Sequence, residues 1–163
     1  MVKKDSQIGV EHCWSVLCKK STLDSETNDL SIISVVDRLQ FKVSPETIQK
    51  STKENSRGFM LPVELEIVSK FKKIDKKKPV AFDYRFRFLN PKAEQLGIFE
   101  GGRLAMDEKI QNMRVRARIG SFLVEKENGR GDYAIAVDIK SVTEGEYTEV
   151  DRIPVEIEWS ENK

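Results

Sequence analysis

The chain has 163 residues, of which 39% are hydrophobic and 34% are charged, and its 28 basic and 27 acidic side chains leave a net charge of +1. This composition excludes a disordered chain, and the length predicts a single domain over residues 1–163 with a core of its own. The near-zero net charge disfavours nucleic acid as a partner, and no apolar run approaches the roughly 18 residues that a membrane-spanning helix needs.

The first strand is expected close to the N-terminus, behind a short tail. Residues 1–10 begin with basic side chains but have no apolar stretch behind them, so we expect a disordered tail and no signal peptide. Residues 11–19 alternate as a strand with apolar side chains on both faces. Its two cysteines, Cys13 and Cys18, fall on opposite faces, which predicts reduced thiols and a cytoplasmic protein.

The next segment, residues 29–43, is rich in Ile and Val. β-branched residues favour a strand over a helix, and Ile33 and Val35 fall in phase on its apolar face. Asp37 interrupts that phase and indicates a bend or an edge position. The Ser-Pro-Glu sequence that follows is typical of a helix start and predicts one short, exposed helix over residues 44–53.

The rest of the chain alternates apolar and polar residues with period 2, interrupted by turns. One phase change, after Ile119, predicts a β-bulge near Gly120. An Asn-Gly pair at residues 128–129 is typical of a hairpin tip. Strands are predicted over residues 63–71, 80–89, 113–124, 133–140 and 153–159, with a short one through Leu96 and Ile98.

The number and pattern of these strands predict the fold class. Eight or nine strands, each with one apolar and one polar face, are what two packed sheets require. We therefore expect an all-β protein, a single antiparallel β-sandwich with at most one short helix. A closed β-barrel is the alternative.

Several strand and turn sequences resemble a known group of proteins. The strand His12-Cys13-Trp14-Ser15-Val16-Leu17-Cys18 leads into Leu23-Asp24-Ser25-Glu26-Thr27-Asn28 and Leu30-Ser31-Ile32-Ile33, and Phe86-Arg87-Phe88-Leu89-Asn90-Pro91 comes later. They resemble small bacterial proteins of uncharacterised function with an immunoglobulin-like β-sandwich domain. The resemblance implies that fold over most of the chain, and it implies no catalytic residue.

Two groups of basic side chains are candidate anion-binding sites. Arginines alternate along two strands and would form a stripe that binds a polyanion if the strands are neighbours. A lysine-rich turn suits a phosphate or an acidic partner. The structural alternatives are cross-strand pairing with acids and a solvated hairpin tip. The ten residues are Arg85, Arg87, Arg114, Arg116, Arg118, Lys72, Lys73, Lys76, Lys77 and Lys78.

The sequence predicts no catalytic, cofactor-binding or metal-binding residue. His12 is the only histidine, which excludes a two-histidine metal site and allows at most one Ser-His or Cys-His pair. The acids from Asp24 to Asp29 lack the spacing of an EF-hand, and a hairpin turn is the simpler interpretation. No glycine-rich phosphate loop occurs.

These observations predict a non-enzymatic, cytoplasmic β-sandwich module that binds another protein or self-associates through its apolar strands near the N-terminus. One alternative is a polyanion-binding module, and another is a carboxylate-based domain that is Ca²⁺-dependent or hydrolytic. The charge is unevenly distributed: residues 57–118 carry 15 basic and 8 acidic side chains, and residues 119–163 carry 5 and 11. A polyanion site therefore stays possible wherever acidic strands do not cover the basic ones.

Overall fold

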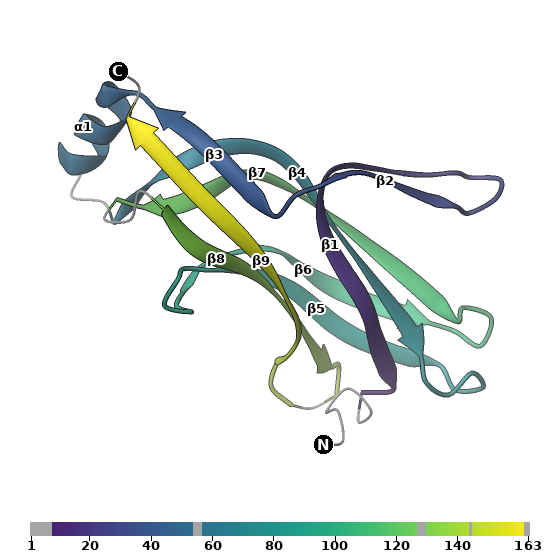
Figure 1. Ribbon diagram of the computed structural model, residues 1–163. Helices are drawn as coiled ribbons and strands as arrows, with labels where there is room; N and C mark the ends of the chain where they lie inside the picture. The colour runs from purple at the N-terminus through teal and green to yellow at the C-terminus, as the bar shows by residue number, and fades with distance from the viewer. Residues whose placement is uncertain (1–7, 54–56, 127–129, 144, 162–163) are drawn as a thin grey trace.

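The computed structural model describes residues 8–53, 57–126, 130–143 and 145–161, which form nine strands and one helix in two packed sheets (Figure 1). It confirms the predicted all-β sandwich. Of the expected tail, residues 1–7 lie outside the described residues, residues 8 and 9 form a turn, and the first strand opens at residue 10. The elements are β1 (Val10–Leu23), β2 (Leu30–Val35), β3 (Arg38–Val43), α1 (Pro45–Lys53), β4 (Gly58–Lys73), β5 (Val80–Leu89), β6 (Gln95–Met106), β7 (Asn112–Glu125), β8 (Arg130–Ser141) and β9 (Thr148–Glu161).

The strands form a four-stranded sheet in the order β2-β1-β4-β7 and a five-stranded sheet in the order β3-β9-β8-β5-β6. The two sheets stay separate, so β2, β7, β3 and β6 are edge strands. Neighbouring strands are antiparallel except β3 and β9, which are parallel, so the prediction of a wholly antiparallel sandwich is wrong at this one pair. In the described part of the chain, no helix has the length and apolar character to cross a membrane.

The predicted strand over residues 29–43 is divided between the two sheets. β2 belongs to the four-stranded sheet and β3 to the five-stranded one, and the chain crosses between them at Val36 and Asp37. The Val36 amide still bonds to the first sheet, whereas the carbonyl of Asp37 accepts a hydrogen bond from the second, 2.8 Å from Glu156 N. Asp37 therefore marks the predicted bend.

The core lies between the inward faces of the two sheets. Aromatic rings from both sheets meet there: Phe88 of β5 lies 4.7 Å from Phe122 of β7 and 5.3 Å from Tyr133 of β8, between ring centroids. Each such ring pair contributes about 1 kcal/mol beyond the burial of its area. The register of β4 against β7 shifts between Pro62 and Leu65, opposite Gly120, which confirms the predicted irregularity.

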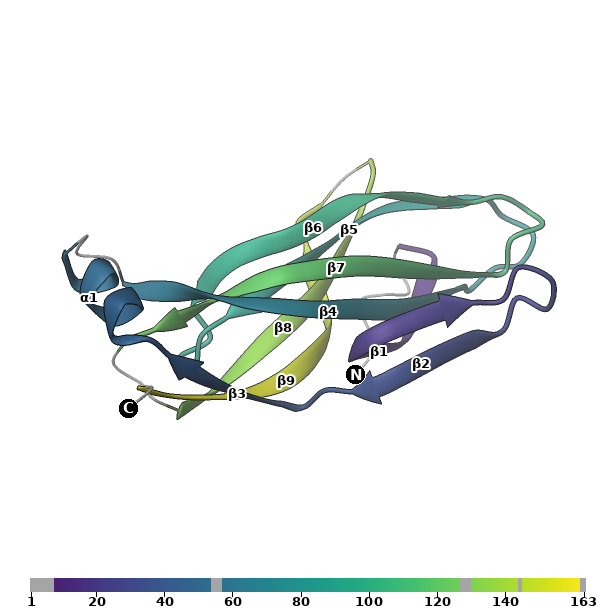
Figure 2. The same cartoon turned by 90° about the horizontal axis from the view of Figure 1, so that it is seen from above.

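The hairpin of β1 and β2 forms an arm, which we define as residues 19–35. β1 pairs with β4 only as far as Cys18, and beyond that residue it pairs with β2 alone. The arm leaves the body of the sheet as a two-stranded ribbon (Figure 1 and Figure 2). Its Ser21 is bound by Glu66, an outward-facing residue of β4. The arm therefore lies against the outward face of the four-stranded sheet.

Candidate functional site

The arginines expected to form one stripe lie on two different sheets. Arg85 and Arg87 belong to β5 in the five-stranded sheet, and Arg114, Arg116 and Arg118 belong to β7 in the four-stranded sheet. Because both strands turn these side chains away from the core, the two groups face opposite sides of the sandwich. The structure therefore contains two separate basic groups, each with its own partners.

Arg85 and Arg87 share a buried carboxylate on the outward face of the five-stranded sheet. The Asp138 side chain is 1% exposed and accepts hydrogen bonds from Arg85 Nε at 2.7 Å and from Arg87 Nε and Nη2 at 2.5 and 2.8 Å. Burial alone would raise the pKa of Asp138, but the hydrogen bonds from the two arginines prevail and hold it below its ordinary value. The ring of Tyr147 covers Arg85, with its centroid 3.9 Å from the guanidinium carbon. This group is a closed ion cluster of the sheet.

The arginines of β7 are exposed and face the arm. Arg114 and Arg116 donate to backbone carbonyls of the arm, at Asn28 and Ser21 respectively, over 3.1 and 3.3 Å. The ladder also places Arg114 directly opposite Lys70 of β4, two like charges side by side. In the described part of the chain neither Lys70 nor Arg114 forms an ion pair with an acid. The outward face of the four-stranded sheet is therefore, among the described residues, the one that carries unpaired basic side chains.

Glu66 connects the arm to the four-stranded sheet. Its carboxylate accepts hydrogen bonds from the Ser21 amide at 2.7 Å and the Ser21 hydroxyl at 2.6 Å, and it lies 3.7 Å from Arg118. Burial would raise the pKa of Glu66, but the bonds from Ser21 and the charges of Arg116 and Arg118 keep it below its ordinary value. The ionised carboxylate is therefore a fixed anchor for the arm.

The predicted lysine run does not form one surface. Lys72 and the turn lysines are exposed, but Lys73 is 1% exposed and its Nζ donates to the carbonyl of Asp107 at 2.6 Å. Lys73 thus supports the loop between β6 and β7 and is inaccessible to a ligand. The exposed members of the run are Lys72, Lys76, Lys77 and Lys78.

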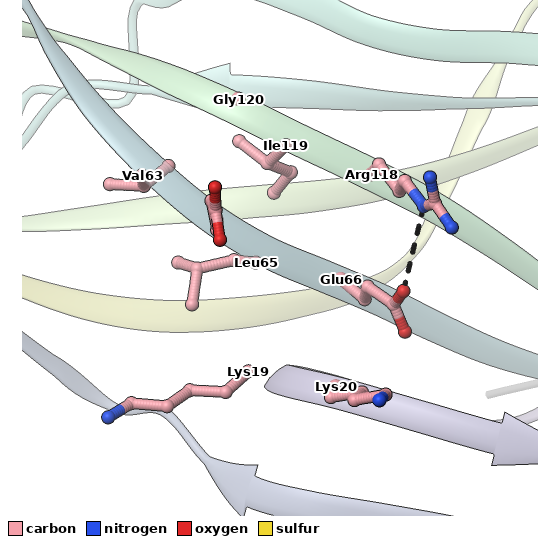
Figure 3. Close-up of a pocket in the computed structure, with 9 residues that line it drawn as sticks. Lys19, Lys20, Val63, Leu65, Glu66, Arg118, Ile119 and Gly120 are labelled. Carbon is pink, nitrogen blue, oxygen red and sulfur yellow. Dashed lines mark ion pairs between the residues drawn. The ribbon is translucent and has the colours of Figure 1, made fainter.

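A pocket of about 440 Å³ opens where β1 parts from β4 (Figure 3). Lys19 and Lys20 lie on its β1 side and Arg118 on its β7 side, with β4 running between them. The same strand supplies Glu64 and Glu66, so positive and negative side chains alternate around the opening. The basic groups do not converge on one point, and the pocket by itself does not select an anion.

A second hollow, of about 350 Å³, lies between the edge strands β6 and β7, and sequence reasoning missed it. Phe88 and Ile119 form its buried floor, and Met60 and Ile98 stand at its rim, 56% and 53% exposed. We call it the β6/β7 groove. Its signal in the sequence was the absence of charge: residues 95–99 and 119–124 contain no charged side chain. The residues that line it are Met60, Phe88, Leu96, Gly97, Ile98, Phe99, Arg118, Ile119, Gly120, Ser121 and Leu123.

His12 does take part in a serine cluster. A bulge at Cys13 puts His12 on the inward face with Ser15, and its Nε2 lies 2.7 Å from the Ser15 hydroxyl, which is itself 2.7 Å from that of Ser69. Asp151 of β9 lies 3.6 Å from the same Nε2. A catalytic triad binds its serine and its carboxylate through opposite ring nitrogens. This arrangement instead links β1 to β4 and β9.

The acids of the arm tip form a turn. The Asp24 carboxylate accepts hydrogen bonds from the amides of Glu26 and Thr27 at 2.8 and 2.9 Å. These bonds, that from Thr27 first, lower the pKa of Asp24. Among the described residues, no group of three or more His, Cys, Asp or Glu side chains is placed to hold a metal ion.

Comparison with known proteins gives no family: neither a family model nor a curated protein matches the sequence. Among solved structures, the chain is similar to the N-terminal domain of PorA, with a TM-score of 0.28 and 9% identity over 90% of this chain and 97% of that one. It is also similar to the CooA pilin subunit from enterotoxigenic Escherichia coli, with a TM-score of 0.26 and 8% identity over 91% of this chain and 99% of that one. At these scores neither match carries a function to this chain, and the immunoglobulin-like kinship and the bacterial source stay predictions.

Proposed function

We propose that this chain is a non-enzymatic, cytoplasmic β-sandwich module that associates with other copies of itself through β2. The observation that carries the proposal is the character of this edge strand. Residues 30–36 contain no charged side chain, and Ile33 and Val35 are 48% and 66% exposed. Edge strands of soluble proteins are usually protected by charge, proline or a bulge. An uncharged edge strand rich in β-branched residues is suited to pairing with another strand.

The position of these two side chains supports this function. The sequence placed Ile33 and Val35 in phase on one apolar face of a strand near the N-terminus, and β2 lies on the arm, where both side chains are exposed. Burying both would contribute about 3 kcal/mol, since full burial of such a side chain is worth roughly 1.5–3 kcal/mol and each is already partly covered. That gain is available only from a partner.

Other features support the remaining parts of the proposal. Cys13 is exposed and Cys18 is buried beside the carbonyl of Glu66, and the two thiols are not bridged, which suits a reducing compartment. Burial, followed by the charge of Glu66, raises the pKa of Cys18 and makes it a poor nucleophile. His12 and Asp138 are engaged in contacts that hold strands together. These uses of the polar groups support a structural module over an enzyme.

The test is the molar mass as a function of concentration, by light scattering after size-exclusion chromatography. The wild-type mass should rise above that of one chain as the concentration increases, whereas Ile33→Lys should stay monomeric. Ile74→Lys is the matched control, because Ile74 is also 51% exposed but lies in the turn after β4 and not on β2. A wild-type protein that stays monomeric at all concentrations would contradict the proposal.

Polyanion binding is a second candidate, favoured by the like-charged pair of Lys70 and Arg114 on the outward face of the four-stranded sheet. Retention on heparin should then fall steeply with salt, because binding releases counterions. Arg114→Glu combined with Arg116→Glu should abolish retention, and Arg85→Glu should not, since Arg85 belongs to the closed cluster around Asp138. Equal retention of the wild type, the double variant and Arg85→Glu would exclude polyanion binding by this face.

A further inference from the structure

The β6/β7 groove is an apolar opening on the side of the sandwich where both sheets end in an edge strand. β6 closes the five-stranded sheet and β7 closes the four-stranded one. Between them the floor residues Phe88 and Ile119 are each 2% exposed, while the rim residues Met60 and Ile98 are more than half exposed. The groove therefore runs from the exposed rim down to side chains of the core.

The two strand segments that wall the groove carry no charge, and each contains a glycine. In a chain that is 34% charged, residues 95–99 of β6 and residues 119–124 of β7 carry no charged side chain. Each wall also contains a glycine, Gly97 or Gly120, at which an added Cβ would meet no atom within 4 Å. A glycine in an edge strand lets another backbone come close. These walls are thus suited to an extended segment.

β2 matches this groove in length, polarity and charge. Its six residues span about 20 Å, and the walls, five and six residues long, span a similar length at roughly 3.3 Å per residue. Ile33 and Val35 of β2 are 48% and 66% exposed, so both apolar side chains are available to a groove. Residues 21–37 carry four acids and no base, whereas the charged side chain at the groove is Arg118, which lies 3.7 Å from Glu66 of its own chain but is 82% exposed and so still accessible to a further acid. The ends of the segment and the groove are complementary.

We infer that the β6/β7 groove receives β2 of a second copy of this chain, so that copies join head to tail. The inference rests on the proposed self-association and names the second surface of that contact. β2 and β7 are the opposite edges of one sheet, so a chain does not fill its own groove in this way. Two different surfaces in contact form a heterologous interface, which continues into an open chain of copies unless the rotation closes a ring.

Two variants, each damaging one surface, test this arrangement. Ile33→Lys places a charge on β2, and Gly120→Lys places one at the groove, where an added Cβ meets no atom within 4 Å in the monomer. Each variant alone should lose assembly by more than about tenfold, because a lysine would be buried without a partner. Mixed in equal amounts, they should form a dimer and nothing larger, since each supplies the surface that the other lacks. Sedimentation velocity measures this directly, with Ile74→Lys as the control.

The outcomes separate this inference from the proposed function. If the wild-type protein assembles and Gly120→Lys assembles equally well, self-association stands and the groove is not its partner surface. A pair of β2 strands from two copies would give that result, and the mixture would then contain dimers of Gly120→Lys with itself but none that joins Gly120→Lys to Ile33→Lys. If each variant is monomeric with a wild-type urea midpoint and the mixture also stays monomeric, the head-to-tail contact is overturned.

Discussion

Replacing Asp138 with Asn removes the carboxylate that two arginines share on the outward face of the five-stranded sheet. Asparagine has nearly the same shape as aspartate, but it is neutral, and its NH2 group is a hydrogen-bond donor that cannot accept from the guanidinium groups. Removing one partner of a buried ion pair costs about 3–5 kcal/mol. The side chains of Arg85 and Arg87 are 28% and 19% exposed, so water relieves part of the remaining repulsion. We therefore expect the free energy of unfolding to fall by about 3 kcal/mol at pH 7, the lower end of that range.

The pH dependence of this loss gives an independent check. The hydrogen bonds from Arg87 and Arg85 outweigh burial and place the folded pKa of Asp138 below its unfolded value, about 4. Such a carboxyl stabilises the fold above its unfolded pKa, and the stabilisation is lost as the pH falls through the folded pKa. The difference between wild type and Asp138→Asn should thus be constant from about pH 8 to 5 and shrink below about pH 4. Urea unfolding followed by tryptophan fluorescence measures it.

Asp83→Asn is the matched control on the same face. Its carboxylate is 15% exposed and binds Arg103 and Lys140, whose side chains are 63% and 33% exposed, so water screens these pairs and we expect a loss of only about 1 kcal/mol. The reasoning is refuted if Asp138→Asn loses no more stability than Asp83→Asn, or if its loss is the same at pH 3 as at pH 7.

Three further substitutions test the arm, a close backbone contact and the core. Glu66→Gln weakens the two hydrogen bonds from Ser21, so the Ser21 amide should exchange with solvent about tenfold faster, and an unchanged rate would contradict the anchoring role. Gly58→Ala should lower the free energy of unfolding by more than about 2 kcal/mol, because the added Cβ would collide with the backbone of β7. Gly120→Ala, the control, should change the free energy of unfolding by less than about 0.5 kcal/mol. Equal urea midpoints for the two variants would contradict this prediction. Phe88→Ala, which leaves a cavity among three aromatic rings, should cost about 3–5 kcal/mol in urea unfolding, and a loss under about 1 kcal/mol would show that the core closes over it.

The strands were predictable because most of them bury one face. In β4, β7 and β8 the alternation of apolar and polar residues reports contact with the core, and even the irregularity opposite Gly120 follows from a change of phase. Residues 30–35 were recognised as a strand from their β-branched residues, but a strand that offers its apolar side chains to a partner has the composition of one that buries them. Only the path of the arm, away from β4 after Cys18, distinguishes the two cases.

The candidate sites were less predictable because they depend on which strands are neighbours. Alternation showed that Arg87 and Arg114 face away from the core, but not that they belong to different sheets. The partner of Arg87, Asp138, is 51 residues away in sequence, and the β5–β8 ladder places it opposite Arg85, two residues from Arg87. Lys73 is buried because the carbonyl of Asp107, 34 residues later in the sequence, accepts a hydrogen bond from its Nζ. The residues around Lys73 in the sequence do not predict this contact. The groove had a signal, its uncharged walls, but needed the packing of the sheets to become visible.

Hydrogen–deuterium exchange of the wild-type protein at low and high concentration tests the central claim most directly, because it reports both surfaces in one unmodified chain. We expect the amides of residues 30–35 in β2 and of residues 119–124 in β7 to become protected together as the concentration rises, while the turn that contains Ile74 does not change. Protection of β2 alone would indicate pairing between two β2 strands. If neither segment changes with concentration, the account of head-to-tail self-association is wrong.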